Sequence, residues 1–143
     1  MSKSNTFETD ILGLIFNAAP VANIADNAAA SPLANLFVAL HTADPGEAGV
    51  QNTSETAYTG YARASVARTS GGWTVAAGSV SPNANIDFGV CTAAPGAAIT
   101  HASVGVASSG ATKILYSGAL SSSIAVAIGT IPRITTGSTI TED

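Results

Sequence analysis

The chain has 143 residues and a mass of 14.1 kDa, a length that suits one domain able to bury a core without metal or disulfide crosslinks. Ala, Ser, Thr and Gly dominate the sequence, charged residues make up only 10%, and the net charge is −4, so the basic patch of a nucleic-acid-binding protein is excluded. No apolar run approaches the roughly 18–20 residues that span a bilayer, and the first residues lack the basic-then-apolar pattern of a signal peptide. We therefore expect no nucleic-acid or membrane partner.

The first predicted element is a helix over residues 5–18, NTFETDILGLIFNA. Asn5 is the expected N-cap, with Glu8 three residues later in a capping-box-like pair, and Pro20 ends the helix. Four large apolar side chains follow a helical spacing and form one stripe: Phe7, Ile11, Leu14 and Ile15. Because so short a helix is marginal alone, its stripe must pack either on the body of the chain or on a neighbouring subunit.

The Ala- and Asn-rich segment that follows lacks side chains large enough to anchor a core. The sequence therefore predicts two parts, an N-terminal helix and connecting arm over residues 1–32 and a β domain over residues 33–143. The hydrophobic period changes from 3.6 to 2 after Leu33, which indicates a strand ending near His41. Asp-Pro-Gly at 44–46 supplies turn chemistry, and we expect a long exposed loop over residues 43–57.

Short strands separated by turn residues continue to the end of the chain. They are predicted within residues 59–69, 72–80, 85–93, 99–107, 112–120, 122–130 and 134–143. This spacing, with no helical pattern between the strands, indicates an all-β, jelly-roll-like antiparallel sandwich. The larger apolar residues at alternating positions form the expected core: Leu36, Val38, Leu40, Val66, Ile86, Phe88, Val104, Val106, Ile114, Ile124 and Val126.

Residues that could carry chemistry are few. His41 and His101 are the only histidines, and Asp44 lies three residues after the first, but no nucleophile-elbow pattern surrounds any serine. The lone cysteine, Cys91, and Asp87 do not complete a zinc or calcium spacing with them. We expect no catalytic residue, no metal and no cofactor, histidines that hydrogen-bond their neighbours, and a Cys91 that fills a half-buried position.

A surface poor in charge and rich in small side chains suits close contact with other proteins. Tyr61 and Arg63 share one face of a predicted strand, where they would contact a partner or form a solvated face. Trp73 follows two glycines and is either a core corner or an interface anchor. The candidate interface residues are Phe7, Ile11, Tyr61, Arg63 and Trp73.

Four segments resemble small virion proteins of tailed bacteriophages: LHTADPGEAG at 40–49, YTGYAR at 58–63, GGW at 71–73 and TITED at 139–143. The resemblance covers most of the chain, and we favour the head decoration, or cement, type. It implies a protein made in the host cytoplasm that binds the outside of the major capsid protein shell and bridges its subunits. It implies no catalytic residue.

Self-association is expected on general grounds, as a homodimer in preference to a homotrimer. The alternative role is a tail-fibre, tail-tip or baseplate component of the virion. A carbohydrate-binding sandwich is disfavoured because the aromatic residues are scattered, and an enzyme is disfavoured by the thin inventory of reactive groups.

Overall fold

The computed structural model describes residues 4–21 and 32–142. It contains one helix, α1 (Asn5–Asn17), and strands that pair antiparallel wherever a register is defined. The predicted all-β antiparallel fold with a short N-terminal helix is confirmed. Most of the predicted connecting arm, residues 22–31, lies outside the described residues, and the domain boundary at residue 32 stays a prediction.

The chain forms two compact units. The first, here called the helical unit, consists of residues 1–35, 66–86 and 134–143, and the second, here called the sheet unit, consists of residues 36–65 and 87–133. The strands are β1 (Asn35–His41), β2 (Ala64–Ala67), β3 (Trp73–Ala76), β4 (Ser79–Pro82), β5 (Ile86–Asp87), β6 (Ile99–Gly105), β7 (Ile114–Ile124), β8 (Arg133–Ile134) and β9 (Ile140–Thr141).

Helix α1 begins at Asn5, which the sequence analysis expected to be its N-cap. Ser4, not Asn5, is the N-cap, and its hydroxyl accepts the Phe7 N–H at 3.4 Å. Ser satisfies an orphan N–H of the first turn as well as Asn does, so the sequence alone did not separate the two. At the other end Ala18 adopts the left-handed conformation with φ 54° and terminates the helix before Pro20.

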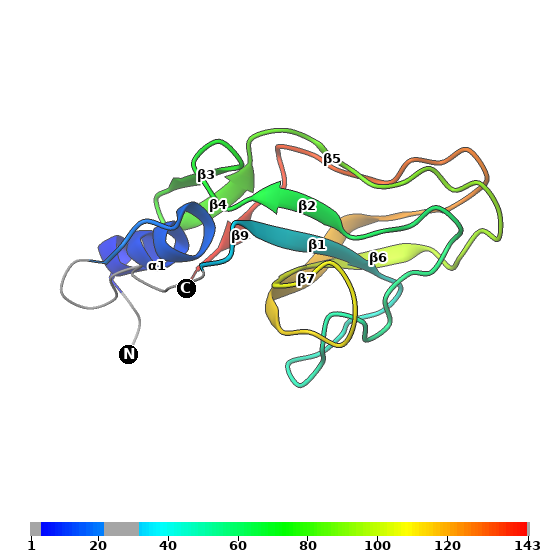
Figure 1. Ribbon diagram of the computed structural model, residues 1–143, viewed down its shortest axis with the longest axis horizontal. Coiled ribbons are helices and arrows are strands. Elements are labelled where there is room, and N and C mark those ends of the chain that lie inside the picture. Colours follow the sequence, from blue (N-terminus) through cyan, green and yellow to red (C-terminus); the bar gives the residue numbers. More distant parts are fainter. Residues whose placement is uncertain (1–3, 22–31, 143) are drawn as a thin grey trace. The chain divides into compact units, whose positions relative to one another are not determined.

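The buried face of α1 differs from the predicted stripe. Leu12 and Phe16 are fully buried, and the helix packs on the β3–β4 hairpin of its own unit (Figure 1). The Phe16 ring meets the Trp73 ring edge-to-face, with centroids 4.8 Å apart. The predicted stripe is rotated away from this contact, because the aromatic pair fixes which side faces the hairpin: Phe7 is exposed, and Ile11, Leu14 and Ile15 are half-buried.

Residues 72–80, predicted as one strand, form two. Ala77 and Gly78 have φ values of 51° and 72°, which is the conformation of a two-residue hairpin turn. The turn joins β3 to β4, and β4 pairs in turn with β9. Arg68 of the same unit donates to the Leu14 and Ile15 carbonyls at the C-terminal end of α1, where a cation is stabilised by the helix dipole.

In the sheet unit, β1, β6 and β7 run side by side (Figure 1), within a sheet whose strand order is β2-β1-β6-β7. Val38 faces Val104 across β1 and β6, and Leu40 faces Ala102. The last four residues of β1 are buried on both faces, which explains why this strand is more apolar than a strand with one solvated face.

Several predicted strands are shorter than expected. Of residues 59–69 only β2 is a strand, of 85–93 only β5, and the region 122–130 holds the end of β7 followed by a loop. Seven predicted core residues are buried: Leu36, Val38, Leu40, Ile86, Phe88, Val104 and Val126. The other four are half-buried: Val66, Val106, Ile114 and Ile124. Buried residues missing from the prediction include Leu12, Phe16, Tyr58, Trp73, Val80, Ile99 and Ile134.

Candidate functional site

Two of the four segments that mark this sequence, those at 40–49 and 58–63, contribute residues to a buried polar network of the sheet unit. We define the polar network as His41, Gln51, Glu55, Tyr61, Arg63, Ser103 and Thr112. These residues come from the end of β1, from the long loop after it, from β6, and from the segment between β6 and β7. The network therefore connects the loops of the sheet unit to strands β1 and β6.

Arg63 is the centre of the polar network. Its guanidinium holds Glu55 with two parallel hydrogen bonds, Nε to Oε1 at 2.7 Å and NH2 to Oε2 at 2.8 Å. It also donates to the backbone carbonyls of Ala107 at 3.0 Å and Gly110 at 2.8 Å. The Arg63 side chain is only 1% exposed. The paired carboxylate raises the pKa of the guanidinium and compensates for its burial.

Gln51 joins Arg63 to the sheet. Its amide nitrogen donates to the Phe37 carbonyl at 2.7 Å, while its oxygen accepts from Arg63 NH1 and from the Thr112 hydroxyl, both at 3.1 Å. A side chain at Gly105 would place its Cβ 2.3 Å from the Gln51 oxygen. The glycine is therefore required for Gln51 to reach the strand.

Tyr61 connects the same carboxylate to β1 and to the aromatic core. Its hydroxyl donates to Glu55 Oε1 at 2.8 Å and accepts the Leu40 N–H at 3.1 Å. Burial raises the pKa of this phenol. The Tyr61 ring stacks on Phe88 at 6.1 Å and meets Tyr58 edge-to-face at 5.5 Å.

The glycine of the YTGYAR motif permits a close approach of two loops. Gly60 has a φ of 105°, and a Cβ there would lie 2.1 Å from the Val90 carbonyl oxygen. The hydroxyl of Tyr58 donates to the Gly89 carbonyl at 2.7 Å. Both contacts join the motif to the segment that follows β5.

His41 and Ser103 form a hydrogen-bonded pair that resembles the nucleophile and base of a hydrolase. The Nε2 atom lies 2.8 Å from the Ser103 hydroxyl, and Nδ1 lies 2.8 Å from the Thr53 carbonyl. Because a carbonyl only accepts, Nδ1 carries the proton and Nε2 accepts from the serine. Burial lowers the pKa of His41, although the Thr53 carbonyl and the Glu55 charge partly oppose this shift.

The pair is enclosed, with His41 fully buried and Ser103 2% exposed, so no substrate atom can approach the serine oxygen. Asp44 does not orient the histidine, because its carboxylate accepts the Gly46 N–H at 2.9 Å in the predicted turn. His101, cross-strand from His41, is half-buried and bonds the Thr100 hydroxyl at 2.9 Å. The prediction that both histidines hydrogen-bond their neighbours is confirmed, and the prediction that the chain is no enzyme stays untested.

Residues 43–57 are a loop, but not a uniformly exposed one. Pro45, Gln51 and Thr56 are buried, since the loop folds back and Thr56 donates its N–H to the Leu40 carbonyl at 2.9 Å. Cys91, expected to be half-buried, is fully buried. Its backbone N–H donates to the Thr130 carbonyl at 2.9 Å, and its thiol donates to the Ala93 carbonyl at 3.6 Å.

The five candidate interface residues divide into two groups. Phe7 is 40% exposed and Ile11 half-buried, so both remain on the surface of the helical unit. Trp73 and Arg63 are buried, and Tyr61 is half-buried. The prediction that Tyr61 and Arg63 share one face of a strand is wrong, because residues 59–63 are not a strand. Whether any of the five contacts a partner stays a prediction.

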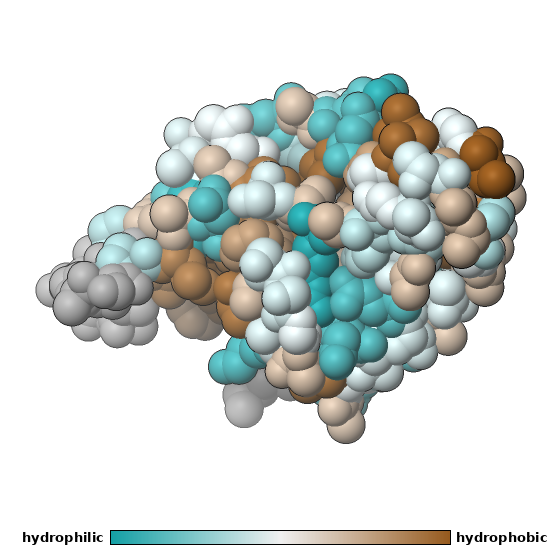
Figure 2. Space-filling view, turned by 45° about the vertical axis from the view of Figure 1, so that its right-hand side comes forward, coloured by the Kyte–Doolittle hydropathy of each residue, from teal (hydrophilic) through white to brown (hydrophobic). Residues whose placement is uncertain are grey.

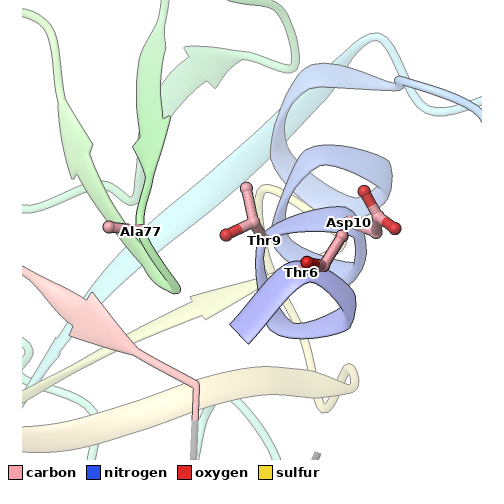
Figure 3. Close-up of a pocket in the computed structure, with 4 residues that line it drawn as sticks. All are labelled: Thr6, Thr9, Asp10 and Ala77. Carbon is pink, nitrogen blue, oxygen red and sulfur yellow. The ribbon is translucent and has the colours of Figure 1, made fainter. Parts of the chain in front are cut away.

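Figure 3 shows an open depression between the first turns of α1 and the β3–β4 turn, lined by Thr6, Thr9, Asp10 and Ala77. The Thr9 hydroxyl accepts the Gly78 N–H at 2.9 Å. One carboxylate and two hydroxyls do not make up a metal-ligand set. Across residues 4–21 and 32–142, no three His, Cys, Asp or Glu side chains gather as a metal site, and no helix has the length and hydrophobicity to cross a bilayer.

A comparison with protein families identifies the family of the whole chain. The family described as "Podophage GP4 fiber I protein gp80" matches residues 2–142, and a comparison with curated proteins finds no match. The chain belongs to the gp80 fiber family and is a structural component of a bacteriophage virion. The predicted resemblance to phage virion proteins is therefore confirmed, whereas the narrower assignment to the head decoration type gains no support from this family.

Proposed function

We propose that the chain is a structural module of a podophage fiber, which was the alternative to the head decoration role in the sequence interpretation. The match over residues 2–142 carries this proposal. It covers both the polar network and α1, so it concerns the whole fold and not one shared motif.

The polar network supports a mechanical role for the chain. Loops normally move more than the elements that they connect, but here Arg63 donates three hydrogen bonds to Gln51 and Glu55 of the loop over residues 43–57. Its other three hydrogen bonds go to the segment between β6 and β7, so one side chain holds the two irregular segments together. Because buried charge pairs favour one arrangement of the backbone over others in some proteins, the network would keep the unit in a single shape under mechanical load. We propose no cofactor, metal or catalytic residue for this role.

The surface supports contact with other virion proteins. Figure 2 shows a face on which pale residues of weak hydropathy lie beside teal hydrophilic ones, with brown apolar groups in separate places. Only 10% of the residues are charged, so few ion pairs can form across an interface, and binding to a virion partner would depend weakly on salt.

Sedimentation with isolated virion parts tests the proposal. Purified chain is mixed with tails that lack the fiber and, separately, with shells of the major capsid protein, and each mixture is sedimented at low and high salt. Co-sedimentation with the tails at both salt concentrations is expected. Binding to the shells alone would contradict the fiber proposal and favour the decoration role, in which the major capsid protein is the partner.

A further inference from the structure

Gln51 and Thr112 are held together at two points, although Thr112 follows Gln51 by 61 residues in the chain. The backbone N–H of Gln51 donates to the Thr112 carbonyl at 2.8 Å. The Thr112 hydroxyl donates to the side-chain oxygen of Gln51 at 3.1 Å. Gln51 is fully buried, and Thr112 is half-buried. A hydroxyl group is therefore positioned beside a buried carboxamide, as a nucleophile is positioned beside an acyl group before transfer.

Arg63 polarises this carboxamide. Its NH1 atom donates to the Gln51 oxygen at 3.1 Å and to the Thr112 hydroxyl oxygen at 3.2 Å. Since a guanidinium only donates, the hydroxyl oxygen accepts from Arg63 with one lone pair, keeps its own proton for Gln51 and retains a second lone pair. Negative charge that develops on the Gln51 oxygen during attack would lie against a fixed cation, an arrangement that lowers the barrier to acyl transfer.

Two further contacts fix the orientation of the carboxamide. The amide nitrogen donates to the Phe37 carbonyl at 2.7 Å, so the oxygen stays directed at Thr112 and Arg63. The carboxamide also lies against the backbone of Gly105, where a Cβ would be 2.4 Å from the carboxamide carbon. Both reacting groups are thus held in place before any reaction, which removes much of the entropic cost of bringing them together.

We propose that Gln51 and Thr112 form an intramolecular ester cross-link with release of ammonia. The Thr112 oxygen attacks the carboxamide carbon of Gln51, and the hydroxyl proton passes to the Gln51 oxygen, to which it already donates. The tetrahedral intermediate then re-forms the C=O bond as the carbon–nitrogen bond breaks. The electron pair of that bond goes to nitrogen, and the same proton leaves on it as ammonia. The step consumes no oxidant, reductant or further reactant.

The cross-link would join the loop over residues 43–57 to the segment between β6 and β7. It would close a loop of 61 residues, which restricts the unfolded chain in the way that a disulfide does. Burial of Gln51 keeps water from the ester and so opposes its hydrolysis. The inference concerns a reaction within one chain and therefore does not depend on the proposed role in a fiber.

Intact mass and a tryptic digest of the wild type test the cross-link. After incubation at neutral pH and denaturation, the linked chain should be lighter than its sequence by one molecule of ammonia. Gln51 is the only glutamine in the sequence, and trypsin separates it, in residues 4–63, from Thr112, in residues 69–113. These two peptides should remain joined. Hydroxylamine, which cleaves esters, should separate them.

Variants identify the nucleophile. Thr112→Val keeps the size of the side chain without the hydroxyl, and it should show the full sequence mass and two separate peptides. Thr112→Ser restores a hydroxyl and should restore the link. The matched control is Thr92→Val, which removes an exposed hydroxyl that donates to the Thr59 carbonyl and should leave the link intact. Circular dichroism establishes that each variant keeps its sheet.

Three results would overturn the proposal. The first is a wild type that keeps its full sequence mass after prolonged incubation. The second is loss of ammonia while the two peptides stay separate, which would indicate a succinimide at an asparagine. The third is a link that persists in Thr112→Val. Sedimentation with tails tests the proposed function separately, so failure of either one is distinguished from failure of the other.

Discussion

Replacing Arg63 with Met tests whether the polar network holds the sheet unit together. Methionine keeps most of the buried length of the side chain but removes the charge and six hydrogen bonds. Breaking a buried ion pair from one side costs about 3–5 kcal/mol, because the remaining charge is left uncompensated. Glu55 keeps the Tyr61 hydroxyl and is 16% exposed, so we expect the lower end, about 3 kcal/mol.

Urea unfolding followed by circular dichroism measures the change. With an m value of about 1.5–2 kcal/mol/M, the midpoint of Arg63→Met should fall by about 1.5–2 M. The matched control is Arg133→Met, because Arg133 holds Asp87 in a similar two-bond pair whose side chains are 50% and 48% exposed. Water screens that pair, so its loss should change the midpoint little. Equal midpoints for the two variants would refute a stabilising role for the network.

Three further changes probe the same unit. Burial lowers the pKa of His41 below 6.5, so the unfolded chain binds a proton at a higher pH than the folded chain does. The stability that neutral His41 contributes is therefore present above pH 6.5 and is lost as the pH falls. Urea midpoints at pH 7.5 and 5 should differ less in His41→Gln than in the wild type, and an equal difference would contradict this reasoning. Phe88→Ala should cost about 3–5 kcal/mol in urea unfolding, since Phe88 is 4% exposed and stacks on Tyr61, and a loss below about 1 kcal/mol would count against a core position. Gly60→Ala should cost at least about 2 kcal/mol, because a Cβ there meets the Val90 carbonyl oxygen. The control Gly118→Ala, where a Cβ meets open space, should change stability by less than about 0.5 kcal/mol. Similar thermal midpoints for the two variants would argue against the close approach at Gly60.

The regular elements could be predicted from local patterns. The alternation from Leu36 to Leu40 identified β1, and the strands predicted within residues 99–107 and 112–120 correspond to β6 and β7, which pair antiparallel. The β3–β4 turn was missed because it consists of Ala77 and Gly78 alone, and alanine is an unusual residue at positive φ.

The polar network could not be predicted, because its members lie in irregular segments that follow no period. Arg63 and Glu55 are eight residues apart in the chain, and Thr112 reaches Gln51 from the segment after β6. Alternation placed Tyr61 and Arg63 on an outer strand face, but the carboxylate at Glu55 draws both side chains inward. One available signal was the excess of hydrogen-bonding residues in the loop before the motif, which suggests internal contacts when charged residues are otherwise rare.

The location of the chain on intact virions tests the fiber assignment most directly. Gold-labelled antibodies raised against the purified chain can be imaged on particles by electron microscopy, with particles lacking the protein as the control. The account predicts label on fibers and none spread over the head surface. Label distributed over the capsid lattice, with bare fibers, would contradict it.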